Sequence, residues 1–399
     1  MKLRRLLLAC ALATLHAPAW ADTNVKLGVL TDLSGPYADL SGKGSVIATQ
    51  MAVEEFQKLH PDFKIEVISS DHQNKPDIGS SVVRKWFDQD GVDAVVDVAS
   101  SGVAMAVGQL AKDGNKVFLA SGPASSDITN KACSPNTIQW TYDTYALSKS
   151  TASALVQSGG NKWFFITTDY VFGHAMERDT SRFVEAAGGK VVGRARVPIN
   201  TPDFSSFLLQ ARSSGANVVG LANAGADTIN AVKQAAEFGL TKGGIRLAGL
   251  LVDITDVHGL GLPASQGLVI TQAFYWDLND STRAFSKRFA ERAEGKMPGQ
   301  VHAGAYSATL HYLKALAAGA PKTDGKAVVA KMEELPTEDE AFGRGSVRKD
   351  GRKLHDMYLF EVKKPAESSG GWDLYKRLAT VPADQVFRPL AESECALAR

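Results

Sequence analysis

Two serine-rich turns are the segments of this chain best suited to chemistry. Ser100 and Ser101 follow the apolar run 93–99, and the turn 121–126 follows the apolar run 116–120. Each run predicts a β-strand that ends in small hydroxyl residues where a helix begins. Helix starts expose unpaired N–H groups and positive partial charge, so these turns suit a small anion such as a carboxylate. Helix capping alone is the commoner role of such serines and is compatible with that function.

A third turn has the same position relative to its strand. The run 25–33 predicts a strand, Ser34-Gly35-Pro36-Tyr37 breaks it, and the run 43–59 predicts a helix. In an open parallel sheet, ligands bind beyond the carboxyl ends of the strands. Tyr37 is therefore a candidate wall of a binding site, and a surface turn residue is the alternative interpretation.

No segment of the sequence matches a catalytic or metal-binding motif. The chain has no G-x-x-x-x-G-K-[ST] loop and no H-E-x-x-H motif, and its histidines are scattered without ligand spacing. The segment 259–264 matches a dinucleotide-binding fingerprint only superficially, because Pro263 interrupts it and no strand, turn and helix surround it. We therefore predict a protein that is not an enzyme and that uses no cofactor and no metal.

The first residues predict export. Lys2, Arg4 and Arg5 precede a short apolar run, and Ala19-Trp20-Ala21 matches a signal-peptidase site, so residues 1–21 read as a signal peptide cleaved after Ala21. The 44 basic and 43 acidic residues nearly cancel, which argues against a nucleic-acid partner.

Two cysteines, Cys133 and Cys395, lie outside the predicted signal peptide. An exported compartment favours disulfides, and no further cysteine competes for either thiol. We expect the pair to bond and to tie the C-terminal tail to the loop after the Ser121 turn. Two separate thiols are the alternative.

Strand-like and helix-like runs alternate along most of the chain, which predicts an α/β fold with parallel sheets covered by helices on both faces. A chain of 399 residues exceeds what one core usually supports, so two doubly wound sheets fit better than one. Near the C-terminus the pattern changes. The run 267–275 predicts a long strand, and 357–362 predicts a late strand before an irregular tail.

From residue 25 to about 376, the chain resembles the type I periplasmic solute-binding proteins, in the leucine/isoleucine/valine-binding branch that serves ATP-driven importers. The resemblance rests on motifs in a fixed order, namely residues 25–37, Asp71 with 74–76, Ser100-Ser101, 121–125, 169–173, and 274–280 with 286–289.

The resemblance implies two Rossmann-like lobes joined by a three-crossing hinge, with crossings near Tyr142, Thr271 and Gly345. The first lobe would hold residues 25–142 and 272–345, and the second would hold 143–271 and 346–399 with the C-terminal tail. It also implies a periplasmic monomer that binds a small carboxylate and delivers it to an inner-membrane ABC permease. A ligand sensor on the same fold, signalling to a membrane partner, is the alternative.

The resemblance also implies roles for individual residues. Those expected to receive the ligand carboxylate on the first lobe are Ser100, Ser101, Ser121, Ala124 and Ser125. Tyr170 and Phe172 would press on the ligand from the second lobe, with Tyr170 preferred and ordinary core packing the alternative for Phe172. Asn223, Ala224 and Asp227 end the strand 217–222 and are expected to face the cleft.

One position departs from the pattern of the family's amino-acid binders. Where those proteins have a glutamate that pairs with the ligand ammonium, this chain has Leu251. Asp253 lies two residues further on and could substitute, and a buried ammonium without a carboxylate would be costly. Either Asp253 pairs with an ammonium, or the ligand has none and is an aromatic or keto acid. Ala224 replaces an aromatic residue, which leaves room for a different or larger ligand.

Overall fold

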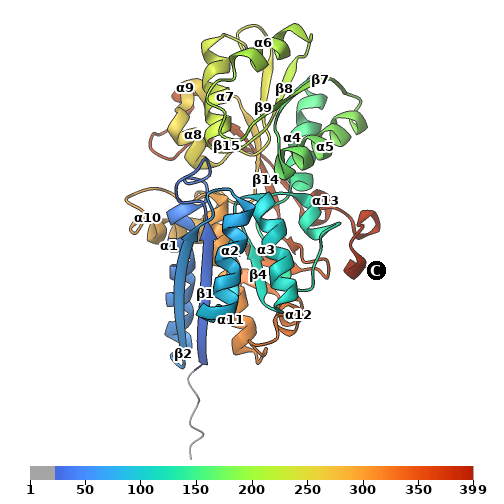
Figure 1. Cartoon of the computed structure of the whole chain (residues 1–399). Coiled ribbons are helices and arrows are strands. Elements are labelled where there is room, and N and C mark those ends of the chain that lie inside the picture. The colour runs from blue at the N-terminus through green and yellow to red at the C-terminus, as the bar shows by residue number, and fades with distance from the viewer. Residues whose placement is uncertain (1–22, 399) are drawn as a thin grey trace, which may run out of the picture.

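The computed structural model describes residues 23–398, so the predicted signal peptide lies outside the described residues. The chain forms two α/β lobes, one above the other in Figure 1. Each lobe is built on its own mainly parallel sheet with helices on both faces, which confirms the predicted fold class. We call the part built on the N-terminal sheet lobe 1 and the other part lobe 2.

Lobe 1 contains five parallel strands, β1 (Thr23–Thr31), β2 (Phe63–Asp71), β3 (Ala94–Asp97), β4 (Val117–Ala120) and β5 (Thr137–Gln139), in the order β2-β1-β3-β4-β5. One face is covered by α1 (Gly42–Leu59), α10 (Asp280–Ala290), α11 (Gln300–Ala317) and α12 (Gly325–Glu334). The other face is covered by α2 (Pro76–Lys85), a short π-helix (Trp86–Asp90) and α3 (Ser101–Asp113).

Lobe 2 contains five strands that continue the alternation, β6 (Lys162–Thr168), β7 (Lys190–Val197), β8 (Val218–Ala222), β9 (Arg246–Gly249) and β10 (Val269–Gln272). Its helices are α4 (Thr144–Gln157), α5 (Val171–Ala186), α6 (Ser205–Ser213), α7 (Ala226–Glu237), α8 (Ile254–Leu260) and α9 (Leu262–Ser265). The central strand β6 is buried apart from Lys162, because its aromatic and β-branched side chains pack against helices on both faces.

The late strands correct two expectations. The expected strand 267–275 is shorter in the structure, where β10 spans Val269–Gln272. The expected irregular tail contains a strand, β15 (Tyr375–Val381), which pairs antiparallel with β14 (Met357–Val362) and completes the order β15-β14-β10-β9-β8-β6-β7. β14 also pairs antiparallel with β10, so this side of the sheet is not parallel. As an edge strand, β15 is mostly exposed, and its weak apolar pattern gave no strand signal.

The chain passes between the lobes three times, after β5, after β10 and before β14. The third passage follows a small sheet made of β11 (Thr337–Asp339), β12 (Gly343–Val347) and β13 (Lys353–Leu354). Nη1 of the buried Arg352 donates to the carbonyl oxygen of Tyr142 at 2.8 Å, and His355 Nε2 lies 2.7 Å from that of Thr141. The first and third passages are therefore bonded side by side.

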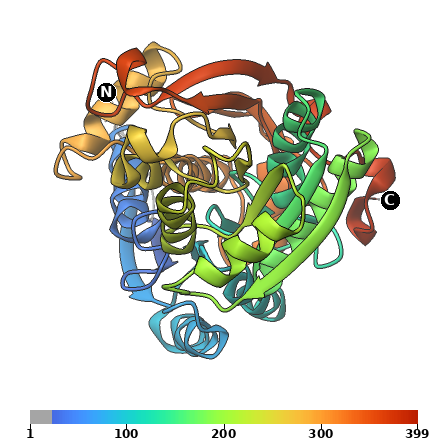
Figure 2. The same ribbon diagram turned by 90° about the horizontal axis from the view of Figure 1, so that it is seen from above.

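After β15 the chain forms α13 (Ala383–Val386) and reaches the edge of the molecule, where the C-terminal segment is visible in Figure 2. Cys395 there forms a disulfide with Cys133, in the loop between β4 and β5, and their Cα atoms are 5.7 Å apart. No helix among residues 23–398 is long and apolar enough to cross a bilayer.

Candidate functional site

The residues that follow the strands of the two sheets meet between the lobes. They are Tyr37 after β1, Ser100 after β3 and Ser121 after β4 on lobe 1, with Tyr170 after β6, Asn223 after β8 and Asp253 after β9 on lobe 2. All are buried except Tyr170, which is half-buried. Around them, side chains of both lobes form what we call the inter-lobe cluster, made of Tyr37, Leu40, Ala99, Ala124, Tyr142, Ala224, Leu250 and Leu251. The structure thus brings polar strand ends together beside an apolar wall.

The serines of the two turns have different surroundings. Ser100 precedes α3, but its side chain makes no capping hydrogen bond. The Oγ of Ser121 is buried and has no hydrogen-bond partner among the described residues. The other two hydroxyls have structural partners, because Ser101 Oγ accepts from the N–H of Ser125 at 3.1 Å and Ser125 Oγ accepts from that of Asp127 at 3.3 Å. Ser100 and Ser121 therefore offer hydroxyls that the protein itself does not use.

Tyr37 is held by a rigid loop. The carboxylate of Asp32 accepts from the N–H groups of Gly35 at 2.8 Å and Tyr37 at 2.9 Å, and that of Asp71 accepts from the Ser34 hydroxyl at 2.6 Å. These bonds fix the turn after β1, and Tyr37 is buried and not a surface residue. No sequence signal singled out Asp32, although it directly follows the strand.

Tyr37 and Tyr170 join the two lobes. Their hydroxyl oxygens lie 2.6 Å apart, which makes a hydrogen bond across the gap. Burial, followed by the neighbouring Tyr170, raises the pKa of Tyr37 well above its usual value, and burial also raises the pKa of Tyr170. Both phenols are therefore neutral at ordinary pH. One of the two hydroxyl groups donates its hydrogen to the other oxygen, and the hydrogen of the accepting hydroxyl remains free to donate to a third group.

The start of α3 lies close to Tyr170, the residue that precedes α5, and Phe172 lies on the other side of Tyr170. The Phe172 ring is 2% exposed and lies 5.9 Å, between centroids, from that of Tyr170. A Cβ placed on Gly102 would lie 3.9 Å from a ring carbon of Tyr170 and 4.0 Å from Ser100 Oγ. The start of α3, with its unpaired N–H groups, therefore faces Tyr170, while Phe172 packs behind it in the core.

The end of β8 touches lobe 1 through its backbone. The N–H of Ala226 donates to the carbonyl oxygen of Pro36 at 3.1 Å. Gly225 has φ +56°, and a Cβ there would overlap that oxygen, so only glycine permits this approach. Asn223 Oδ1 accepts from the Thr228 hydroxyl at 2.7 Å, while its buried Nδ2 has no partner among the described residues.

Asp253 joins the starts of two helices. Its Oδ1 accepts from the N–H of Ile254 at 2.7 Å, and its Oδ2 accepts from that of Gln300, the first residue of α11 in lobe 1, at 3.3 Å. Burial raises its pKa to about 6, and the backbone N–H groups oppose that shift. Both carboxylate oxygens already have partners.

Two residues that the sequence analysis did not assign to the site also take part. The Tyr142 hydroxyl donates to the carbonyl oxygen of Gly122 at 3.0 Å, which places it in the serine turn 121–126. The N–H of Thr144 donates to the carbonyl oxygen of Ala124 at 2.7 Å. The sequence could have pointed to them, because they lie at the predicted first crossing and a segment that crosses between the lobes passes the ligand site.

Comparison with known proteins identifies the family of this chain. A family model described as periplasmic binding protein matches residues 24–370. A Leu/Ile/Val-binding protein homologue of Brucella melitensis is 28% identical over 370 residues, which cover 90% of this chain and 92% of that protein.

Two solved structures share the fold closely. A periplasmic binding protein from Burkholderia mallei is 46% identical, with a TM-score of 0.90 over 95% of this chain and 100% of that chain. A branched-chain amino acid ABC transporter periplasmic ligand-binding protein from Burkholderia xenovorans is 40% identical, with a TM-score of 0.82 over 94% and 100%. These relatives are solute-binding proteins and not enzymes. The chain therefore belongs to the periplasmic binding protein family, in its Leu/Ile/Val-binding-protein-like branch.

Proposed function

We propose that this protein is the periplasmic substrate-binding component of an ABC importer and that it holds a small carboxylate between its lobes. The observation that carries the proposal is the Ser100 hydroxyl at the start of α3, which makes no capping hydrogen bond. The first N–H groups of α3 have no partner within the helix and add positive partial charge beside it. The Ser121 hydroxyl, at the end of β4 and also without a partner among the described residues, is a further candidate donor. A carboxylate there would gain several hydrogen bonds without a buried countercharge.

The opposite lobe supplies the second wall. Tyr170 faces the start of α3, and the remaining hydroxyl hydrogen of its pair with Tyr37 can donate to the same ligand. The apolar remainder of the ligand would lie against the inter-lobe cluster. There, the small side chain of Ala224 leaves room for the ligand, and the apolar side chain of Leu251 offers no charge to an ammonium. We propose ligand contact for Ser101 and Ala124 through their backbone N–H groups. Ser125 would support this turn instead of donating to the ligand, because its N–H group donates to Ser101 Oγ and its hydroxyl accepts from the N–H of Asp127.

The ligand class follows from the carboxylates. An ammonium buried in this cleft needs a carboxylate partner, and the Asp253 carboxylate is fully buried where it joins the starts of α8 and α11. We therefore favour an aromatic or keto acid. A branched-chain amino acid is the second candidate, because the Burkholderia xenovorans relative is named for such ligands.

Delivery follows from closure. Ligand contacts with both lobes would favour the closed form that a permease recognises, and a single chain suffices for that cycle. We propose that the protein reaches the periplasm by cleavage after Ala21. We also propose that the two lobes move against each other, with the third boundary after β13 at Leu354, because the expected boundary at Gly345 lies inside β12, which pairs with both β11 and β13.

Thermal unfolding with added ligand tests the proposal. Leucine, its keto acid α-ketoisocaproate and benzoate differ in the group beside the shared carboxylate, and a bound acid raises the unfolding temperature. We expect at least one of the two acids without an ammonium to stabilise the protein more than leucine does. Ser100→Ala should reduce that shift, because it loses one hydrogen bond to a charged group, and Ser281→Ala, an exposed serine of α10, should retain it. An unchanged shift in Ser100→Ala would refute the proposed carboxylate site.

A further inference from the structure

The C-terminal tail, residues 382–398, starts as part of lobe 2. It follows β15, the edge strand of that lobe, and α13 packs near α4. Phe387 is 1% exposed, and its ring lies 4.9 Å from the guanidinium of Arg352 and 5.5 Å from the ring of His355, both on the third passage between the lobes. The tail is therefore anchored in lobe 2 and against the hinge.

From Arg388 to Cys395, the tail contacts both lobes. Glu392 accepts from Arg182 of α5 at 2.7 Å and from the Tyr145 hydroxyl of α4 at 3.3 Å. Two residues later, the N–H of Glu394 donates to Asn130 Oδ1 at 2.6 Å, and the next residue is Cys395. Asn130 and Cys133 both belong to the lobe 1 loop between β4 and β5, so the disulfide fastens the tail to lobe 1.

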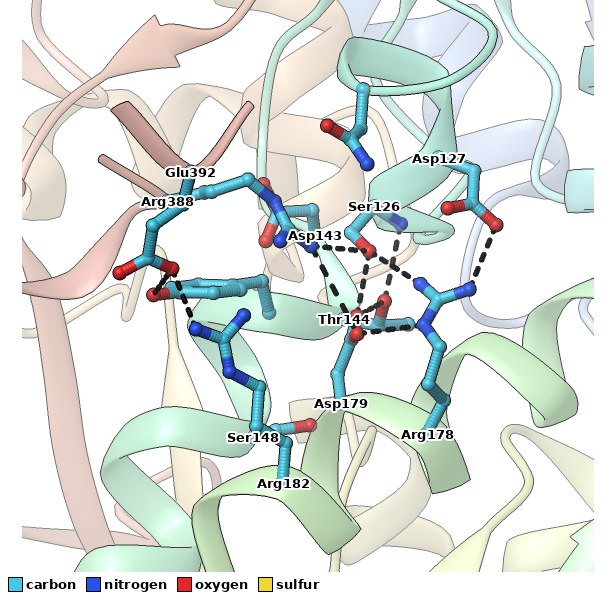
Figure 3. A network of polar contacts seen from close by, with 12 residues as sticks. Ser126, Asp127, Asp143, Thr144, Ser148, Arg178, Asp179, Arg182, Arg388 and Glu392 are labelled. Atoms are coloured by element: carbon cyan, nitrogen blue, oxygen red, sulfur yellow. Dashed lines mark hydrogen bonds and ion pairs between the residues drawn. The ribbon is translucent and has the colours of Figure 1, made fainter. Parts of the chain in front are cut away.

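A polar network beneath the tail bonds the same edges of the two lobes (Figure 3). Arg178 of α5 donates to Asp127 at 3.0 Å and to the Ser126 hydroxyl at 2.9 Å, both on lobe 1. That hydroxyl donates in turn to Asp179 of α5 at 2.6 Å. Arg388 of the tail lies 3.5 Å from the same hydroxyl and stacks on the ring of Tyr145 at 4.6 Å. The tail thus covers a direct contact between the lobes.

We propose that residues 382–398 are a covalent strap, a fourth connection between the lobes that limits how far they separate at this edge. The chain from Glu392 to Glu394 spans at most about 7 Å when fully extended, so the strap has little slack. Opening would then occur mainly at the side where Tyr37 meets Tyr170 and Ala226 meets Pro36. The Glu392 ion pair is exposed and weak, whereas the disulfide persists after that pair breaks.

The strap restricts the open conformations available to the ligand-free protein. If the ligand-free protein has fewer open conformations, it loses less conformational entropy when a ligand closes the lobes. The strap should therefore favour binding. An oxidising compartment keeps such a bond formed. Reduction would therefore widen the opening without changing any residue of the binding site.

Small-angle X-ray scattering of the ligand-free protein tests the strap. We expect Cys133→Ser with Cys395→Ser, and wild-type protein treated with a phosphine reductant, to have a larger radius of gyration than oxidised wild-type protein. Hydrogen exchange should quicken at residues 126–136. Arg178→Ala, which keeps the disulfide, should stay close to wild type, and an equal expansion there would assign the restraint to the polar network and overturn the proposal.

A freed tail could itself enlarge the molecule, so a chain that ends at Arg388 separates the two effects. Removal of peripheral residues lowers the radius of gyration if the lobes keep their arrangement and raises it if they open wider. We expect an increase, with helix content checked by circular dichroism. Superimposable curves for oxidised and reduced protein, or a decrease in the shortened chain, would refute the strap. If the double variant does not fold, reduction of folded wild-type protein decides the outcome.

Discussion

The substitution Asp253→Asn tests whether this carboxylate stabilises the fold or binds the ligand. Burial raises the pKa of Asp253 from 3.8 to about 6 in the folded protein. One pKa unit corresponds to about 1.4 kcal/mol, so the shift amounts to about 3 kcal/mol. Because the folded protein holds this proton more tightly than the unfolded chain, the free energy of unfolding should increase as pH falls from above 6 to below 4. Asparagine does not titrate, so the variant should lack that contribution.

At neutral pH the two consequences of this substitution oppose each other. The variant loses the net cost of the buried charge, about 3 kcal/mol, in which the hydrogen bonds from Ile254 and Gln300 already oppose desolvation. It also replaces these charge-assisted bonds by weaker neutral ones or leaves an N–H group unpaired, which costs about 1–3 kcal/mol. We therefore expect a change within a few kcal/mol at pH 7, and a smaller rise in stability on acidification than in wild-type protein. For a chain of this size, about 3 kcal/mol corresponds to roughly 4 °C in unfolding temperature.

Differential scanning calorimetry between pH 4 and pH 8 provides the measurement, with Asp88→Asn, an exposed carboxylate, as the matched control. The control should reproduce the wild-type pH profile. Acid binding should persist in Asp253→Asn, because the carboxylate serves the helix starts and not the ligand. An unchanged pH profile in the variant would refute the assigned pKa shift. Selective loss of amino-acid binding would instead make Asp253 the ammonium partner.

The remaining predictions concern the contact between the lobes. Gly225→Ala should weaken acid binding in calorimetric titrations, because a Cβ with φ +56° would be strained and would overlap the carbonyl oxygen of Pro36 when the lobes close. Tyr170→Phe removes the hydroxyl that meets Tyr37 at 2.6 Å, and the loss of about 0.5–1.5 kcal/mol should raise the dissociation constant roughly twofold to tenfold. Leu251→Glu places a carboxylate in the inter-lobe cluster and should shift the preference toward leucine over its keto acid by roughly tenfold, about 1.4 kcal/mol, in competition titrations.

Each of these variants has a control elsewhere in the chain. Gly239 has φ +64° and open space around its Cβ position, so Gly239→Ala introduces backbone strain without an overlap and should leave binding intact. Tyr358→Phe removes a hydroxyl from β14, away from the site. Leu251→Gln matches the size of the glutamate without its charge. Equal effects in a variant and its control would contradict the corresponding reasoning.

The sequence alone determined the alternation of strands and helices and the positions where ligand groups gather. The strand β14 (Met357–Val362) has the bounds that its apolar pattern predicts. Such patterns are local, because strand and helix periods follow from which side chains face a core. For the same reason, the strand ends at Tyr37 and Ser100 could be recognised without knowledge of their partners.

Only the tertiary structure decided which polar groups remain unused and which are occupied. Ser100 and Asp253 have similar positions at helix starts, yet the Ser100 side chain makes no capping bond, whereas the Asp253 carboxylate binds an N–H group 47 residues away in the other lobe. Tyr37 meets Tyr170 across 133 residues. Hydrogen-bond partners so distant in the sequence depend on how the lobes pack, and the local pattern of residues carries no record of that packing.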